Sequence, residues 1–345
     1  MLTTIIRILV KPLTAAVLLG VVGGLIALDS HAGRAAGGGA LLNVSYDPTR
    51  ELYKSVGEKF TAQWAQKTGQ TVEVKLSNGG SGTQSRAVVD GLDADVVTLA
   101  LWPDTDAIRK AGLINDGWES RFPNNSVPYT STIIFAVRKG NPKGIKDWPD
   151  LVKPGIEIVT PSPKTSGNGK LSFLAAWGSV TQRGGTDAQA KEFVTKLYRQ
   201  VPVLDSGARG STVTFAEKGI GDVHLTWENE GRLEAAEHPG DIELVYPPIS
   251  FKAEPPVAVV DANARRKGTT EAATAYLNFL YTPDGQELAA KNFYRPIDAG
   301  VLERHAADFP TLTLFPITAI AKDWSDAYAK FFNDGALFDS IYANK

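Results

Sequence analysis

The chain contains no cysteine, and this absence removes several classes of site at once. Disulfide bridges, thiolate zinc sites, iron–sulfur clusters and the lipid-bearing cysteine of a lipoprotein all need that side chain. A basic excess is lacking too, because the formal net charge is −2 at pH 7 and the isoelectric point is near 6.1. Nucleic-acid binding depends on a concentrated basic surface, so we expect no nucleic-acid partner.

Long hydrophobic runs are scarce, and the one that exists lies at the N-terminus. Two basic residues precede an apolar run over 13–28, and small residues follow it. This order predicts a signal peptide over residues 1–35, cleaved near Ala32 or Ala35. An uncleaved anchor is the alternative, but a run with three glycines is short for a membrane span of about 20 residues. We therefore expect an exported protein.

Past residue 40, segments with strand periodicity alternate with segments of helix periodicity. The apolar run 96–101 is typical of a buried strand, whereas residues 50–66 carry apolar side chains at helical spacing. This alternation predicts an α/β protein whose parallel-rich sheets are covered by helices on both faces.

Two lobes are expected, because the chain is long enough for two domains and has a turn-rich break at 123–128. We place the first lobe at 41–126 and 251–345 and the second at 127–250. Crossing segments between them predict a hinge with a cleft. The helix expected over 323–332 is assigned to the first lobe.

Four loops share one pattern, which is a strand end, then small residues, then the start of a helix. They lie at 47–50, 79–82, 166–169 and 207–211. In parallel α/β sheets such turns lie at the carboxyl edge of the strands, where ligands bind. Each helix start offers unpaired N–H groups and about half a positive charge, so several together suit an anion. For any single loop, a plain helix cap such as Ser166 explains the same residues.

Three side chains near these loops have two possible roles each. Trp227 ends a further strand, where its indole is either a hydrogen-bond donor to a ligand or part of the core. Arg50 and Arg209 flank two of the loops, where they either contact a ligand or brace the loops through ion pairs.

Catalytic and metal-binding motifs are missing. The histidines beyond the N-terminal segment are His224, His238 and His305. They show neither metal-ligand spacing nor an evident triad. The carboxylate pairs Asp93/Asp95 and Glu228/Glu230 are more typical of solvated or structural groups. We therefore expect no enzymatic activity, no cofactor and no metal.

Several stretches together resemble the periplasmic sulfate-binding proteins of ABC importers. They are SYDPTRELY at 45–53, GGSG at 79–82, PKTSG at 163–167, SGARGST at 206–212, TWENE at 226–230 and AEPPVAVVD at 253–261. The similarity extends from about residue 42 to the C-terminal end.

The resemblance implies a type II periplasmic-binding-protein fold, in which each lobe is a mixed sheet flanked by helices and a hinged cleft separates the lobes. It also implies that uncharged donors alone hold dehydrated sulfate. The implied donors are the backbone N–H groups of Asp47, Ser81, Gly167, Asn168 and Ala208, the Ser166 hydroxyl and the Trp227 indole. Asn168 departs from the family, which commonly has a second glycine there, but a backbone donor remains and asparagine tolerates unusual φ angles.

The function implied is that of a monomeric periplasmic protein. It would capture sulfate, or thiosulfate, and deliver the anion to an ABC transporter permease in the inner membrane. Molybdate and phosphate are alternative ligands, favoured by a larger pocket or by an acidic acceptor in the cleft. A secreted α/β enzyme acting on phosphate or sulfate esters would need a nucleophile with a base, or a metal, and the sequence supplies neither in recognisable form. A scaffold role has no support in the composition.

Overall fold

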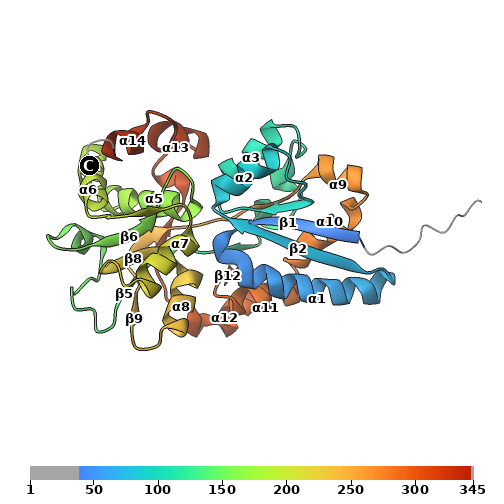
Figure 1. The fold of residues 1–345 in the computed structure, drawn as a ribbon, viewed down its shortest axis with the longest axis horizontal. Coiled ribbons are helices and arrows are strands. Elements are labelled where there is room, and N and C mark those ends of the chain that lie inside the picture. The colour runs from blue at the N-terminus through green and yellow to red at the C-terminus, as the bar shows by residue number, and fades with distance from the viewer. Residues whose placement is uncertain (1–38, 343–345) are drawn as a thin grey trace, which may run out of the picture. The chain divides into compact units, whose positions relative to one another are not determined.

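Two mixed β-sheets organise residues 39–342, the part of the chain that the computed structural model describes (Figure 1). The first sheet has the strand order β11 (Val257–Val259), β3 (Val96–Thr98), β1 (Gly39–Tyr46) and β2 (Val72–Gly79). The second has the order β7 (Leu204–Asp205), β6 (Ile158–Pro161), β8 (Val223–Trp227), β5 (Ile133–Arg138) and β9 (Ile242–Val245). The expected signal peptide lies outside the described residues.

The first sheet is parallel except at β11, and helices cover both of its faces. Successive side chains of a strand point to opposite faces, so Val96 and Val97 enter two different hydrophobic clusters. One cluster packs against α1 (Arg50–Thr68) and α10 (Thr270–Phe279), and the other against α2 (Ser81–Val89) and α3 (Trp102–Lys110).

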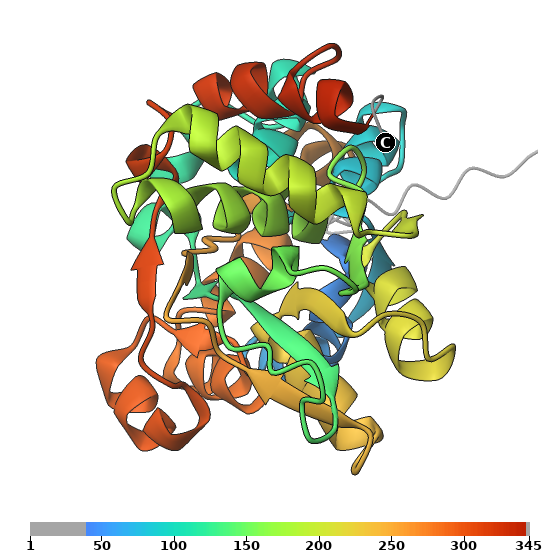
Figure 2. The ribbon, with the colours of Figure 1, turned by 90° about the vertical axis from the view of Figure 1, so that its left-hand side faces the viewer.

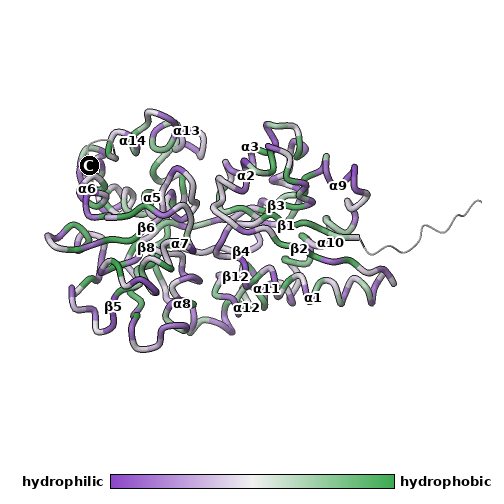
Figure 3. The backbone as a smooth tube through the Cα atoms, viewed as in Figure 1, coloured by the Kyte–Doolittle hydropathy of each residue, from purple (hydrophilic) through white to green (hydrophobic). Residues whose placement is uncertain are grey.

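The second sheet is mixed, because β8 runs parallel to β6 and antiparallel to β5. The helix α5 (Gly167–Thr181) contributes a continuous buried run to the main cluster on one face, together with α6 (Asp187–Arg199). The short α7 (Ala208–Thr212) and α8 (Glu228–Glu237) lie at the other face. Figure 3 shows hydrophobic colour along the inner strands of the second sheet, β5, β6 and β8, whose residues are nearly all buried.

Two short pairs of strands lie outside the two main sheets. The strand β4 (Tyr129–Thr130) pairs with β12 (Arg295–Pro296), and β10 (Ile249–Phe251) pairs with β13 (Thr313–Phe315). Further helices are α4 (Pro123–Ser126), α9 (Asp261–Lys267), α11 (Pro283–Lys291) and α12 (Ala299–Arg304). Among residues 39–342, no helix combines the length and the hydrophobicity needed to cross a bilayer.

The C-terminal helices α13 (Trp324–Phe331) and α14 (Leu337–Tyr342) pack on the second lobe, beside α5 and α6 (Figure 2). The Phe331 ring lies 5.5 Å from that of Phe173 in α5, and the Phe338 ring lies 5.3 Å from that of Tyr198 in α6. The helix at 323–332, expected on the first lobe, thus packs chiefly on α5 of the second lobe, and it also contacts α3 of the first lobe, where the Tyr328 hydroxyl donates to Asp104 at 3.2 Å. Because α5 is hydrophobic on nearly every side, it needs this second aromatic layer to exclude water.

Candidate functional site

One small pocket collects the loops that the sequence singles out. The pocket is small, with about 10 Å³ open to the centre of a water-sized molecule. The lining residues are Tyr46, Asp47, Pro48, Gly79, Gly80, Ser81, Ser166, Gly167, Asn168, Ala208 and Trp227. All seven residues expected to bind a ligand are among them, and they come from the ends of strands in both sheets.

The pocket lies where helices begin. The 3-10 turn η1 (Asp47–Thr49) follows β1 directly, and α2, α5 and α7 begin at Ser81, Gly167 and Ala208. The helix α8 begins immediately after Trp227. The first N–H groups of a helix have no partner inside it and carry the positive end of its dipole. Several such starts around one point offer a small anion many donors without a cationic side chain.

Ser166 is both a helix cap and a pocket residue. Its φ and ψ are −112° and 133°, and its hydroxyl accepts a long hydrogen bond of 3.4 Å from the Gly169 N–H. Accepting that bond leaves the hydroxyl proton available to a ligand. The capping role and the ligand-binding role are therefore compatible in one side chain.

Trp227 presents an unpaired donor to the pocket. Its side chain is fully buried and packs against Tyr46, with ring centroids 5.2 Å apart. Its indole Nε1 has no hydrogen-bond partner among the described residues. A buried N–H without an acceptor is unfavourable by about 1–3 kcal/mol, so this geometry calls for an acceptor in the pocket.

The Asn168 side chain has a structural partner, because its amide donates to the Leu225 carbonyl at 2.9 Å. A ligand would therefore meet the backbone of Asn168 rather than its side chain. Asn168 lies within α5 and does not adopt a positive φ, so the backbone tolerance expected of asparagine is not needed here. Its neighbour Gly167 must be small, because an added Cβ would lie only 2.5 Å from the Cβ of Ala100 in the first lobe.

The charged side chains around the pocket form ion pairs with one another. Arg209 donates to Glu51 at 2.9 Å, and Arg50 lies 4.0 Å from the Asp47 carboxylate. Neither arginine lines the pocket, so both fit the loop-bracing role. Burial raises the pKa of Asp47, and the two arginines act in the opposite direction.

Ser81 contributes its backbone rather than its hydroxyl. The hydroxyl donates to Asp104 at 2.6 Å and accepts from the Ala100 N–H at 3.0 Å. Both of these contacts lie within the first lobe, where they hold the start of α2 in place. The N–H of Ser81 remains one of the orphan donors of that helix.

Sequence reasoning missed part of the lining and part of its support. Tyr46, Pro48, Gly79 and Gly80 line the pocket beside the expected residues. Pro48, Gly79 and Gly80 lie in loops that the sequence singled out, whereas Tyr46 ends the strand before the first of them. Glu228 and Glu230 are fully buried rather than solvated. Within residues 39–342, no group of three His, Cys, Asp or Glu side chains has the geometry of a metal site.

Comparison with known proteins places this architecture in a family. Residues 44–295 match the model of the bacterial extracellular solute-binding proteins. The chain belongs to this family. The two-lobed type II α/β fold, with sheets flanked by helices, agrees with that membership and confirms the expected fold class.

Three relatives of this solute-binding protein are informative. The chain is 54% identical over 303 residues to the sulfate-binding protein of Escherichia coli K12, covering 87% of this chain and 92% of that one. It is 47% identical over 319 residues to the thiosulfate-binding protein of Pseudomonas aeruginosa, covering 90% and 96%. The structure of the sulfate-binding protein SubI from Mycobacterium tuberculosis H37Rv matches with a TM-score of 0.78 at 33% identity, covering 86% of this chain and all of that one.

Proposed function

We propose that this solute-binding protein captures sulfate in the pocket described above, with thiosulfate as the second candidate ligand. The observation that carries the proposal is the buried, unpaired indole N–H of Trp227, which lines a pocket without a cationic side chain. The sulfate-binding and thiosulfate-binding relatives support the same ligand class.

The physical logic rests on neutral donors. Sulfate is a dianion near neutral pH and has only acceptor oxygens. Backbone N–H groups of Asp47, Ser81, Gly167, Asn168 and Ala208 would supply hydrogen bonds. The Ser166 hydroxyl and the Trp227 indole would complete the set. Hydrogen bonds to a charged group are worth about 1.5–3 kcal/mol each, and helix dipoles add to them. Several such bonds together offset the loss of the anion's hydration.

We infer the rest of the biology from family membership and from the relatives. The protein would act as a monomer in the periplasm after removal of its signal peptide. It would pass the bound anion to the permease of an ABC transporter in the inner membrane. We infer lobes at 41–126 with 251–312, and at 127–250 with the C-terminal helices, which modifies the bounds expected from the sequence.

Isothermal titration calorimetry with the exported protein tests the ligand. We expect one site per chain with high affinity for sulfate, and titrations with thiosulfate and molybdate rank the alternatives. A protein that gives no heat with any of these anions would contradict the proposal. A sulfatase and phosphatase assay separates the enzyme alternative, since turnover above the buffer blank would favour catalysis.

A further inference from the structure

A buried carboxylate directly follows the pocket tryptophan. Glu228 is fully buried at the start of α8, and its carboxylate accepts two hydrogen bonds from Arg295, at 2.7 Å from Nε and 2.8 Å from Nη2. Arg295 belongs to β12 and also donates to the Pro310 carbonyl at 2.9 Å. Two hydrogen bonds between a guanidinium and a carboxylate fix the relative orientation of the two side chains, and the opposite charges neutralise each other.

The neighbours of this ion pair converge on the Asp47 segment of the pocket. Asn229, next to Glu228, donates to the Pro48 carbonyl at 2.9 Å. Tyr294, next to Arg295, donates to the same carbonyl at 2.7 Å. The first turn of α8 is thus tied to β12 and to η1, and both η1 and Trp227 line the pocket.

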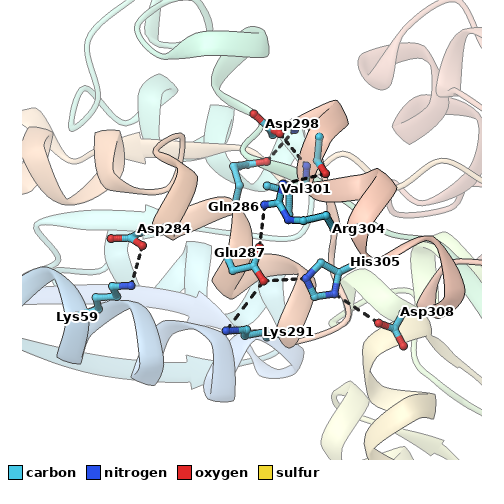
Figure 4. Close-up of polar contacts among 11 residues, drawn as sticks. Lys59, Asp284, Gln286, Glu287, Lys291, Asp298, Val301, Arg304, His305 and Asp308 are labelled. Carbon is cyan, nitrogen blue, oxygen red and sulfur yellow. Dashed lines mark hydrogen bonds and ion pairs between the residues drawn. The ribbon is translucent and has the colours of Figure 1, made fainter.

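Strand pairing and hydrogen bonds to a side chain fix the backbone at and just after Arg295. Thr130 of β4 pairs with it, and the Gln286 side chain accepts from the backbone N–H groups of Ile297 and Asp298, at 2.8 and 3.0 Å. Figure 4 shows Gln286 with Asp298, beside the ion pairs that Glu287 makes between α11 and α12. Gln286 also donates to the Pro128 carbonyl at 2.7 Å, which ties the segment after β12 to the residue that precedes β4.

We propose that Arg295 is a positioning residue of the anion pocket, which neutralises Glu228 and fixes the start of α8 so that the Trp227 indole stays aimed at the ligand. This inference rests on the proposed function. Without the guanidinium, Glu228 would place an unpaired buried negative charge one residue after Trp227, which lines a pocket that must hold a dianion. Leaving one member of a buried ion pair unpaired strongly destabilises the fold. The repulsion between the Glu228 carboxylate and the bound dianion would also weaken ligand binding.

The titratable and charged groups that face Glu228 determine the pH dependence. They are Arg295 from β12, Arg232 from α8 itself and Tyr246, which follows β9. Burial raises the pKa of Glu228, and the two arginines act in the opposite direction. Removing Arg295 leaves mainly the burial effect, so Glu228 should take up a proton as the pH falls. The protonated form would no longer oppose the anion.

The experiment compares the sulfate Kd of Arg295→Gln with that of the wild type across the pH range. At about pH 8 we expect the variant to bind roughly 10- to 100-fold more weakly, and near pH 5 the ratio should approach one, because sulfate stays a dianion while Glu228 is neutralised. The double variant Glu228→Gln/Arg295→Gln has no unpaired buried charge, so it should recover most of the loss at about pH 8. The loss that remains should not vary with pH, and it measures the part of the effect that comes from aiming Trp227. A purely structural ion pair would give a loss that neither acid nor the double variant repairs.

Arg121→Gln is the matched control, because it breaks the 2.6 Å pair with buried Asp261, away from the pocket. It should lower the melting temperature and leave the sulfate Kd unchanged. If Arg295→Gln fails to fold, Arg295→Lys keeps the charge without the two-point geometry, and a Kd within twofold of the wild type would overturn the role in aiming Trp227. A wild-type protein that binds no sulfate overturns the proposed function. A wild type that binds while Arg295→Gln matches it at about pH 8 overturns this inference alone.

Discussion

At the scale of single residues, Ser166 combines two tasks that substitution can separate. Replacing it with alanine removes the hydroxyl donor to the ligand and the cap on the Gly169 N–H. We expect Ser166→Ala to weaken sulfate binding by about 1–3 kcal/mol, or roughly 5- to 150-fold, and to lower stability by about 0.5–2 kcal/mol. Calorimetry measures the first effect and urea unfolding without sulfate measures the second.

Ser172→Ala is the control for Ser166→Ala. Ser172 lies on the same helix, is equally buried, and its hydroxyl has no partner among the described residues. It does not line the pocket, so its loss should leave the sulfate Kd unchanged. Unaltered affinity in Ser166→Ala would remove Ser166 from the site.

Glu230 is the residue through which pH should affect stability. Burial raises its pKa to about 7, although Arg209 acts in the opposite direction and Thr212 donates a hydrogen bond to it. A carboxyl whose pKa is higher in the folded state stabilises the fold at low pH, and this contribution is lost as the pH rises from about 4.5 to about 7. The loss amounts to about 3 kcal/mol at most.

Glu230→Gln removes this titration while keeping the shape of the side chain. The variant should gain stability relative to the wild type between pH 5 and pH 8, and melting curves across that range measure the gain. Glu58→Gln, at an exposed position on α1, serves as the control and should follow the wild type. A difference between Glu230→Gln and the wild type that stays constant with pH would show that Glu230 does not titrate in this range.

At the scale of elements, the helix starts were predictable and the packing of the last helices was not. A few adjacent residues determine each strand-to-helix loop, such as Ser166, the N-cap of α5. Such a helix start can therefore be predicted from the local sequence. The partner of an apolar helix face is a long-range property. Phe331 and Phe338 indicate that α13 and α14 each have a buried face. Only the structure shows that these two rings pack against Phe173 and Tyr198.

The loop before α2 shows how closely the two lobes approach. A Cβ added to Gly80 would lie 2.8 Å from the Thr165 carbonyl and 3.1 Å from the Ser206 carbonyl, both in the second lobe. Gly80→Ala should therefore hold the lobes apart and weaken sulfate binding at least tenfold. The fold of each lobe should survive, because the clash is with backbone across the cleft.

Gly82→Ala provides the comparison for Gly80→Ala. A Cβ at Gly82 would lie 3.5 Å from the same Thr165 carbonyl, an ordinary contact, and alanine favours the helix in which this residue lies. Calorimetry should give Gly82→Ala a wild-type Kd. If both alanine variants bind equally well, close approach at Gly80 is not needed for binding.

At the scale of the whole molecule, neither lobe alone has a complete set of donors. Asp47 and Ser81 follow strands of the first sheet, whereas Ser166 and Ala208 follow strands of the second sheet and Trp227 ends β8. The sequence predicted this division because parallel sheets gather loops at one edge. It did not predict what holds the halves in register, such as the pair of Glu228 and Arg295, since nothing local marks two residues so far apart as partners.

Selectivity should follow from that shared set of donors. Phosphate keeps one or two protons near neutral pH, and a pocket of donors leaves its O–H without an acceptor, at a cost of about 1–3 kcal/mol or more. We therefore expect phosphate to bind at least tenfold more weakly than sulfate at pH 7 in competition calorimetry. The Asp47 carboxylate is the one acidic group in the lining, so Asp47→Asn decides whether it acts as an acceptor. If Asp47→Asn weakens phosphate binding while sparing sulfate, or if the wild type binds both anions equally, the pocket does not discriminate through donors alone.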